Sequence, residues 1–81
     1  MDNVCFLNVR TRSGGPAWGV KVGTEVSGGI SCIGGRQFKT NRDGDVEIRW
    51  TRGCNLRKVY LNGRPKGVDF RDGVSYTLHL D

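Results

Sequence analysis

The side chains with the clearest binding chemistry form a basic stretch in the second half of the chain. No acidic residue lies between Glu47 and Asp69, and this interval contains six cationic side chains: Arg49, Arg52, Arg57, Lys58, Arg64 and Lys66. Lys and Arg attract phosphates, and an aromatic ring beside them stacks on a base. If these cations share a face with Tyr60, and with Trp50 or Trp18 nearby, the stretch predicts a surface for single-stranded nucleic acid. The alternative is a solvated face on which the arginines pair with acidic residues: Asp43, Asp45, Asp69 and Asp72.

The residue types and their spacing do not indicate a catalytic site. Nucleophilic catalysis needs a base beside the nucleophile and a third group that orients it. His79 is the one histidine, and its position near the end of a predicted strand, on the solvent face, indicates a surface residue. The Gly28-Gly29 and Gly34-Gly35 pairs lack the GK[ST] ending of a phosphate loop. We therefore expect no catalytic residue, no cofactor and no enzyme activity.

The three cysteines, Cys5, Cys32 and Cys54, contain no CxxC pair. A zinc site needs three or four converging nitrogen or sulfur ligands, so no metal site is expected. The pattern favours small buried thiols in a reducing compartment. The alternative is a single disulfide, for which the favoured pairing joins Cys5 to one of the other two.

The segment around Asn41, Asp43 and Gly44 matches the third, fifth and sixth positions of a calcium loop. The first and twelfth positions of that loop would then be Lys39 and Trp50. Because both essential carboxylates are missing, the segment is interpreted as a tight turn rather than a calcium site.

Length and composition indicate one domain over residues 1–81. A chain of 81 residues builds one core, and its 13 glycines indicate frequent turns. The formal charge of +5 attracts polyanions but also keeps a protein dissolved, so charge alone decides nothing. The chain contains no apolar run long enough for a membrane span and no signal peptide, which favours the cytoplasm.

Hydrophobic residues alternate with polar ones at period two, as in strands that cover a core on one face. Such strands are predicted over residues 4–11, 20–26, 46–51, 56–61 and 74–80. Residues 30–33 lie between glycine pairs and are interpreted as either an edge strand or a loop. Trp50 is placed in the core, Phe6 faces outward, and Trp18, after the Gly-Pro turn, is expected to cap one end of the core.

Turn residues separate these strands. The Asn41-Arg42-Asp43-Gly44 and Asn62-Gly63 segments each predict a hairpin. Six or seven short strands at this spacing predict an all-β fold, a small antiparallel β-sandwich, with a small β-barrel as the alternative.

Three segments resemble the carboxypeptidase regulatory-like domain, a relative of transthyretin and the Cna-B modules. They are Leu7-Asn8-Val9, the run from Gly15-Pro16 to Val20-Lys21-Val22, and the run from Thr40 through Asp43-Gly44 to Ile48. This resemblance implies a prealbumin-like sandwich that supports, spaces or docks other domains.

The resulting hypothesis is a non-catalytic binding or accessory module that contacts another protein, or a glycan, through loops or an exposed edge strand. Exposed Trp18 beside Tyr60 would provide an aromatic contact for such a partner. The hypothesis from another class is a nucleic-acid-binding domain that uses the stretch from Arg49 to Lys66.

Overall fold

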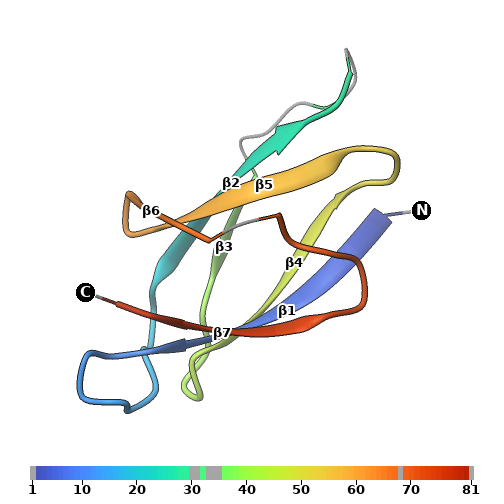
Figure 1. The fold of residues 1–81 in the computed structure, drawn as a ribbon. Coiled ribbons are helices and arrows are strands. Elements are labelled where there is room, and N and C mark those ends of the chain that lie inside the picture. Colours follow the sequence, from blue (N-terminus) through green and yellow to red (C-terminus); the bar gives the residue numbers. More distant parts are fainter. Residues whose placement is uncertain (1, 30–31, 33–35, 68, 81) are drawn as a thin grey trace.

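Seven strands form two packed sheets in the computed structural model, which describes residues 2–29, 32, 36–67 and 69–80 (Figure 1). The strands are β1 (Asp2–Arg10), β2 (Lys21–Ser27), β3 (Gln37–Lys39), β4 (Asp45–Thr51), β5 (Asn55–Leu61), β6 (Arg64–Lys66) and β7 (Ser75–His79). One sheet has the order β4-β1-β7 and the other β3-β2-β5-β6. The predicted all-β sandwich of six or seven strands is confirmed. The described residues form no helix that could span a membrane.

The core lies between the sheets and follows the predicted alternation. Cys5, Leu7 and Val9 of β1 are at most 1% exposed, and Phe6 between them is 43% exposed. Inward side chains of the other strands complete the core: Val22, Ile48, Trp50, Leu56, Val59 and Leu61. Apolar surface removed from water in this way is the main stabilising contribution in a domain of this size.

The Asn62-Gly63 hairpin is confirmed. Asn62 and Gly63 have φ values of 51° and 88°, the two positive angles that a tight turn of this type requires. The turn joins β5 and β6 as antiparallel neighbours.

The predicted hairpin at Asn41–Gly44 is wrong, although the tight turn itself is present. The Asn41 Oδ1 accepts hydrogen bonds from the backbone N–H groups of Asp43 and Asp45, both at 2.9 Å. The strands on either side, β3 and β4, belong to different sheets, so the turn carries the chain from one layer to the other. Turn chemistry reverses the chain locally, whereas strand pairing depends on packing elsewhere.

The last strand also departs from the prediction, because β7 runs parallel to β1 within an otherwise antiparallel sandwich. The preceding segment pairs with the other sheet, where Phe70 forms a bridge with Leu56. Residues 71–74 then cross to the three-stranded sheet, and the Gly73 N–H donates to the Val4 carbonyl at 2.6 Å. A parallel neighbour needs a long crossover connection, and no local pattern reveals which strand it will join.

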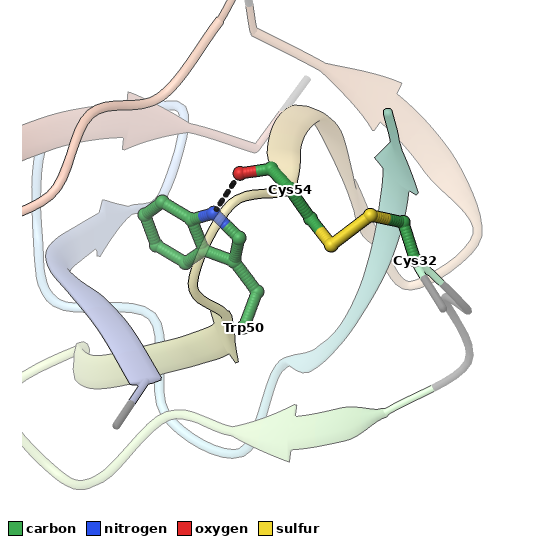
Figure 2. Close-up of a disulfide and its surroundings, with 3 residues drawn as sticks. All are labelled: Cys32, Trp50 and Cys54. Atoms are coloured by element: carbon green, nitrogen blue, oxygen red, sulfur yellow. Dashed lines mark hydrogen bonds between the residues drawn. A yellow bond between two sulfur atoms is a disulfide. The ribbon is translucent and has the colours of Figure 1, made fainter. Parts of the chain in front are cut away.

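The favoured prediction of three unpaired thiols is wrong, and the alternative of one disulfide is correct except that Cys5 does not take part in it. Cys32 and Cys54 form a disulfide with a Cα–Cα distance of 5.6 Å, and Cys5 is the free thiol. Figure 2 shows the bond beside Trp50, whose indole N–H donates to the Cys54 carbonyl at 3.0 Å. Cys5 is fully buried, and burial raises the pKa of its thiol to about 12, so it remains protonated and unreactive at neutral pH. The predicted segment 30–33 lies, apart from Cys32, outside the described residues.

Thr40, the one buried polar residue among those described, fastens the connection between β1 and β2. Its hydroxyl donates to the Ala17 carbonyl at 2.6 Å and accepts from the Val20 N–H at 2.8 Å. A buried polar group left without a partner costs about 1–3 kcal/mol. Thr40 therefore holds the loop that carries Trp18.

Substitution Thr40→Val is expected to lower the free energy of unfolding by about 2–3 kcal/mol, because it leaves two buried backbone groups unpaired at nearly constant volume. Urea unfolding followed by tryptophan fluorescence measures the change. The control is Thr51→Val, since Thr51 is exposed at the end of β4 and should change stability little. Equal effects of the two substitutions would contradict a special role for Thr40.

Candidate binding surfaces

The six residues of the basic stretch do not share one face. Arg49 lies on β4 in the three-stranded sheet, where it is opposite Val4. Arg57 and Lys58 lie on β5, Arg64 and Lys66 lie on β6, and Arg52 follows β4. The structure therefore divides the stretch between two sheets and a turn.

Ion pairs engage part of the stretch. The Arg57 Nε lies 3.0 Å from an oxygen of Asp69, as the alternative interpretation expected, whereas Arg49 pairs with Glu47 at 3.1 Å rather than with an aspartate. Both pairs are exposed, and such pairs contribute about 0–1 kcal/mol. Arg64 and Lys66 also have interaction partners.

A β-bulge places Lys58 on the outer face of the four-stranded sheet. Lys58 is opposite Glu25 and Leu56 is opposite Val26, so Arg57 is the extra residue between two pairs. A bulge shifts the alternation of side chains by one. Lys58 and Tyr60 consequently point outward, while Val59 and Leu61 are fully buried.

The two aromatic candidates lie in different settings. Trp18 is 66% exposed, so its predicted position in the core is wrong. Its neighbours Ala17 and Val20 fill the inward positions, at 2% and 3% exposure, and leave Trp18 on the outside. Tyr60 is half-buried, and its hydroxyl donates to Glu25 at 2.9 Å, which raises the pKa of Tyr60. Trp18 is not among the residues that line the cavity beside Tyr60.

That cavity, here called the Tyr60 notch, has a volume of about 320 Å³ on the outer face of the four-stranded sheet. Gly23 forms its floor, with Gln37 and Tyr60 opposite Gly23 on the two neighbouring strands. Because glycine has no side chain, the space between these two residues stays open. Lys21, Arg36 and Asn62 also line the notch.

A second concavity, the Phe6 groove, lies on the outer face of the three-stranded sheet and has a volume of about 500 Å³. Phe6 is its exposed aromatic ring. Its polar lining residues include two carboxylates and no cation: Asn8, Asn41, Asp45, Glu47, Ser75 and Thr77. Asn8 donates to Asp45 at 2.6 Å, which holds this carboxylate at the groove.

The β7 edge adjoins this groove. The Val74 carbonyl accepts from Phe6, and the Leu80 N–H donates to Arg10, so the backbone groups at these alternate positions face β1. Successive residues of a strand direct these groups to opposite sides, so the N–H and C=O groups of Ser75, Thr77 and His79 face away from the sheet. No strand of the described chain pairs with this side of β7.

The other edges carry features that discourage pairing. Strands β3 and β6 are three residues long, and β6 contains Pro65. Edge strand β4 carries Glu47 and Arg49 on its exposed face, whereas the exposed residues of β7 are Ser75, Thr77 and His79. Short length, proline and charge protect an edge from added strands. Strand β7 has no proline and no Lys, Arg, Asp or Glu, and its five residues make it longer than β3 and β6.

Sequence reasoning missed both concavities. Gly23 at an outward position between Lys21 and Glu25 was an available signal for the notch, since a glycine inside a strand often marks the close approach of another group. No such signal existed for the β7 edge, because its freedom depends on the order of strands in the sheet. Among the described residues no cluster of His, Cys, Asp and Glu could hold a metal ion.

The fold and its surfaces define a small all-β sandwich domain. No protein-family model matches the chain, and no curated protein matches it.

Proposed function

We propose that the domain is a non-catalytic protein-binding module that takes an extended segment of a partner protein as an added strand on the β7 edge. The observation that carries this proposal is the free row of backbone groups at Ser75, Thr77 and His79 on an edge without protecting charge. Backbone hydrogen bonds to an edge strand provide affinity, and neighbouring pockets provide specificity.

The Phe6 groove indicates the chemistry of that segment. Phe6 is directly opposite Ser75, whose small side chain leaves the ring accessible from the β7 side. A large apolar side chain on an added strand can therefore reach over Ser75 to Phe6. The Asp45 carboxylate accepts from a neutral side-chain amide and favours a basic residue nearby, whereas Glu47 is already paired with Arg49. The partner segment is an extended peptide that combines apolar and basic side chains.

The inner side of the edge supports the same occupant. Tyr76, Leu78 and Leu80 pack against the core but are only half-buried, unlike the inward residues of β1. An added strand would cover these side chains and remove further apolar surface from water.

The family resemblance and the predicted compartment are both relevant to this proposal. The resemblance to the carboxypeptidase regulatory-like domain supports an accessory or docking role, and it stays a prediction. The prediction of a cytoplasmic location depended on the absence of a signal peptide and of a membrane span, and it stays a prediction. The Cys32–Cys54 disulfide argues against a reducing compartment, because such bonds persist in oxidising ones.

The test selects extended peptides from a random display library on the wild-type domain and measures their affinity for three variants. Thr77→Pro removes an N–H that faces outward, so it should weaken the selected peptides at least tenfold while leaving pairing with β1 intact. Thr77→Val keeps the N–H and should bind like the wild type. Phe6→Ala should weaken binding about tenfold, as loss of an aromatic anchor does.

Amide chemical shifts complete the test. Addition of a peptide should move the amide signals of Ser75, Thr77 and His79, and the spectrum of each variant without peptide shows that it is folded. Peptides that bind Thr77→Pro as tightly as the wild type, or that shift amides of another face, would refute strand addition. A library that yields no binder with apolar and basic residues would refute the stated partner chemistry.

A further inference from the structure

The outer face of the four-stranded sheet gathers positive charge around one aromatic ring. Lys21 and Lys39 are directly opposite each other on β2 and β3, and Lys58 is opposite Glu25 on β5. Arg36 joins Lys21 at the rim of the Tyr60 notch. We call this set the cationic face: Lys21, Arg36, Lys39, Lys58 and Tyr60.

The charges of this face are only partly compensated, since Glu25, opposite Lys58, is the one carboxylate among the outward residues described on β2. Like charges directly opposite each other destabilise a sheet, so the Lys21–Lys39 neighbours are a local cost to the fold. None of the three lysines, Lys21, Lys39 and Lys58, forms an ion pair within the described part of the chain. The Arg36 guanidinium is exposed but lies 3.4 Å from an oxygen of Asp2 on β1, in the other sheet, so Arg36 contributes less to this face than the three lysines. An anion bound here would relieve the repulsion.

The ring of Tyr60 is held in a fixed position within this charge. Its hydroxyl donates to Glu25, two residues beyond Gly23 on β2. The notch beside the ring is open because Gly23 carries no side chain, and Gln37 forms the opposite wall. A cavity with an aromatic wall accepts a planar group by stacking.

Cations lie on both sides of that ring. Tyr60 is opposite Gly23 on β2. Lys21 lies two residues before Gly23, and Lys58 is opposite Glu25, two residues after Gly23. At about 3.3 Å per residue, these two positions are roughly 13 Å apart along β2, with Tyr60 between them. A stacking ring between cations is the arrangement by which small β-domains hold single strands.

We propose that the cationic face binds single-stranded nucleic acid, with one base stacked on Tyr60 in the notch and phosphates on Lys21 and Lys39 at one side and Lys58 at the other. The site differs from the basic stretch identified in the sequence, with which it shares Tyr60 and, of the six cations, only Lys58. It lies on the four-stranded sheet, whereas the β7 edge belongs to the three-stranded sheet. An acidic polysaccharide would use the same cations, but its sugar rings are not planar and would gain less from the Tyr60 ring than a base does.

The experiment measures fluorescence anisotropy of labelled oligo-dT and oligo-rU with the whole chain at low and moderate salt. Neutralisation of about three phosphates predicts roughly 20-fold weaker binding as salt rises from about 50 to 200 mM. Tyr60→Ala should weaken binding about tenfold, whereas Tyr60→Phe retains the ring and should bind like the wild type. Gly23→Val should also weaken binding, since it fills the notch. A Cβ at Gly23 lies 3.7 Å from the Tyr60 Cβ, an ordinary contact, so this variant should fold.

A charge-matched pair distinguishes the cationic face from overall charge. Lys58→Gln should weaken binding and reduce the salt slope by about 0.7, while Arg52→Gln, a cation outside this face, should leave both unchanged. Equal effects of the two changes would overturn the proposal, as would absence of binding at low salt. Heparin binding that is insensitive to Tyr60→Ala, with no tighter binding of oligonucleotides, would overturn it in favour of an acidic polysaccharide.

Discussion

Reduction of the Cys32–Cys54 disulfide is expected to lower the free energy of unfolding by about 3 kcal/mol. The bond closes a loop with a sequence separation of 22 residues, and removal of such a constraint lets the unfolded chain regain entropy. A domain of this length is stable by roughly 4–12 kcal/mol, so the loss is a large fraction of the total. The bond also fixes the position of Cys54, whose carbonyl accepts from Trp50 in the core.

Urea unfolding with and without a phosphine reductant measures this loss. The matched variant is Cys32→Ser, because Cys32 is only partly buried at the margin of the core, whereas Cys54 is buried within it. This variant should have the stability of the reduced wild type and should not respond to the reductant. Unchanged wild-type stability on reduction, or three free thiols by mass spectrometry of the purified protein, would contradict the prediction.

Substitution Gly44→Ala is expected to destabilise the domain by about 3 kcal/mol or more. Gly44 has a φ of 78°, a conformation that costs an alanine about 1–2 kcal/mol. An added Cβ would also overlap the Val9 carbonyl oxygen, which accepts a hydrogen bond from Ala17 at 2.9 Å. Disruption of that bond leaves buried backbone groups unpaired, at a further cost of about 1–3 kcal/mol.

Gly73→Ala separates these two contributions. Gly73 has nearly the same φ, 79°, but an added Cβ there would meet no atom within 4 Å. The substitution should therefore cost only the conformational part, about 1–2 kcal/mol. Thermal unfolding of both variants measures the difference. Equal losses of stability would show that the close contact between Gly44 and the Val9 carbonyl of β1 adds nothing to the cost of the Gly44→Ala substitution.

The two proposed surfaces have opposite charge and lie on different sheets. The Phe6 groove has two carboxylates among its lining residues, of which Glu47 is paired with Arg49. The cationic face has three lysines and one arginine around Tyr60, against the one carboxylate of Glu25. Opposite potentials on two faces direct partners of opposite charge to different sites. A basic peptide on β7 and a nucleic acid strand on β2 and β5 would therefore not compete.

The strands and the core could be predicted from the sequence because they depend on local chemistry. Alternation at period two placed Leu7, Ile48 and Trp50 in the core and Phe6 outside it. The same reasoning found the Asn62-Gly63 hairpin, where two residues with positive φ determine the turn. Each of these features is decided by residues that are close together in the chain.

Tertiary structure alone decided the features that involve distant residues. The membership of β3 and β4 in different sheets, the parallel pairing of β7 with β1 and the partner of Cys54 each depend on how the layers pack. The same packing exposes Trp18, because Ala17 and Val20 occupy the inward positions, and it separates Arg49 from Lys58. Side-chain alternation specifies which face of a strand is buried but not which strand lies beside it, so both proposed surfaces follow from the arrangement of the sheets.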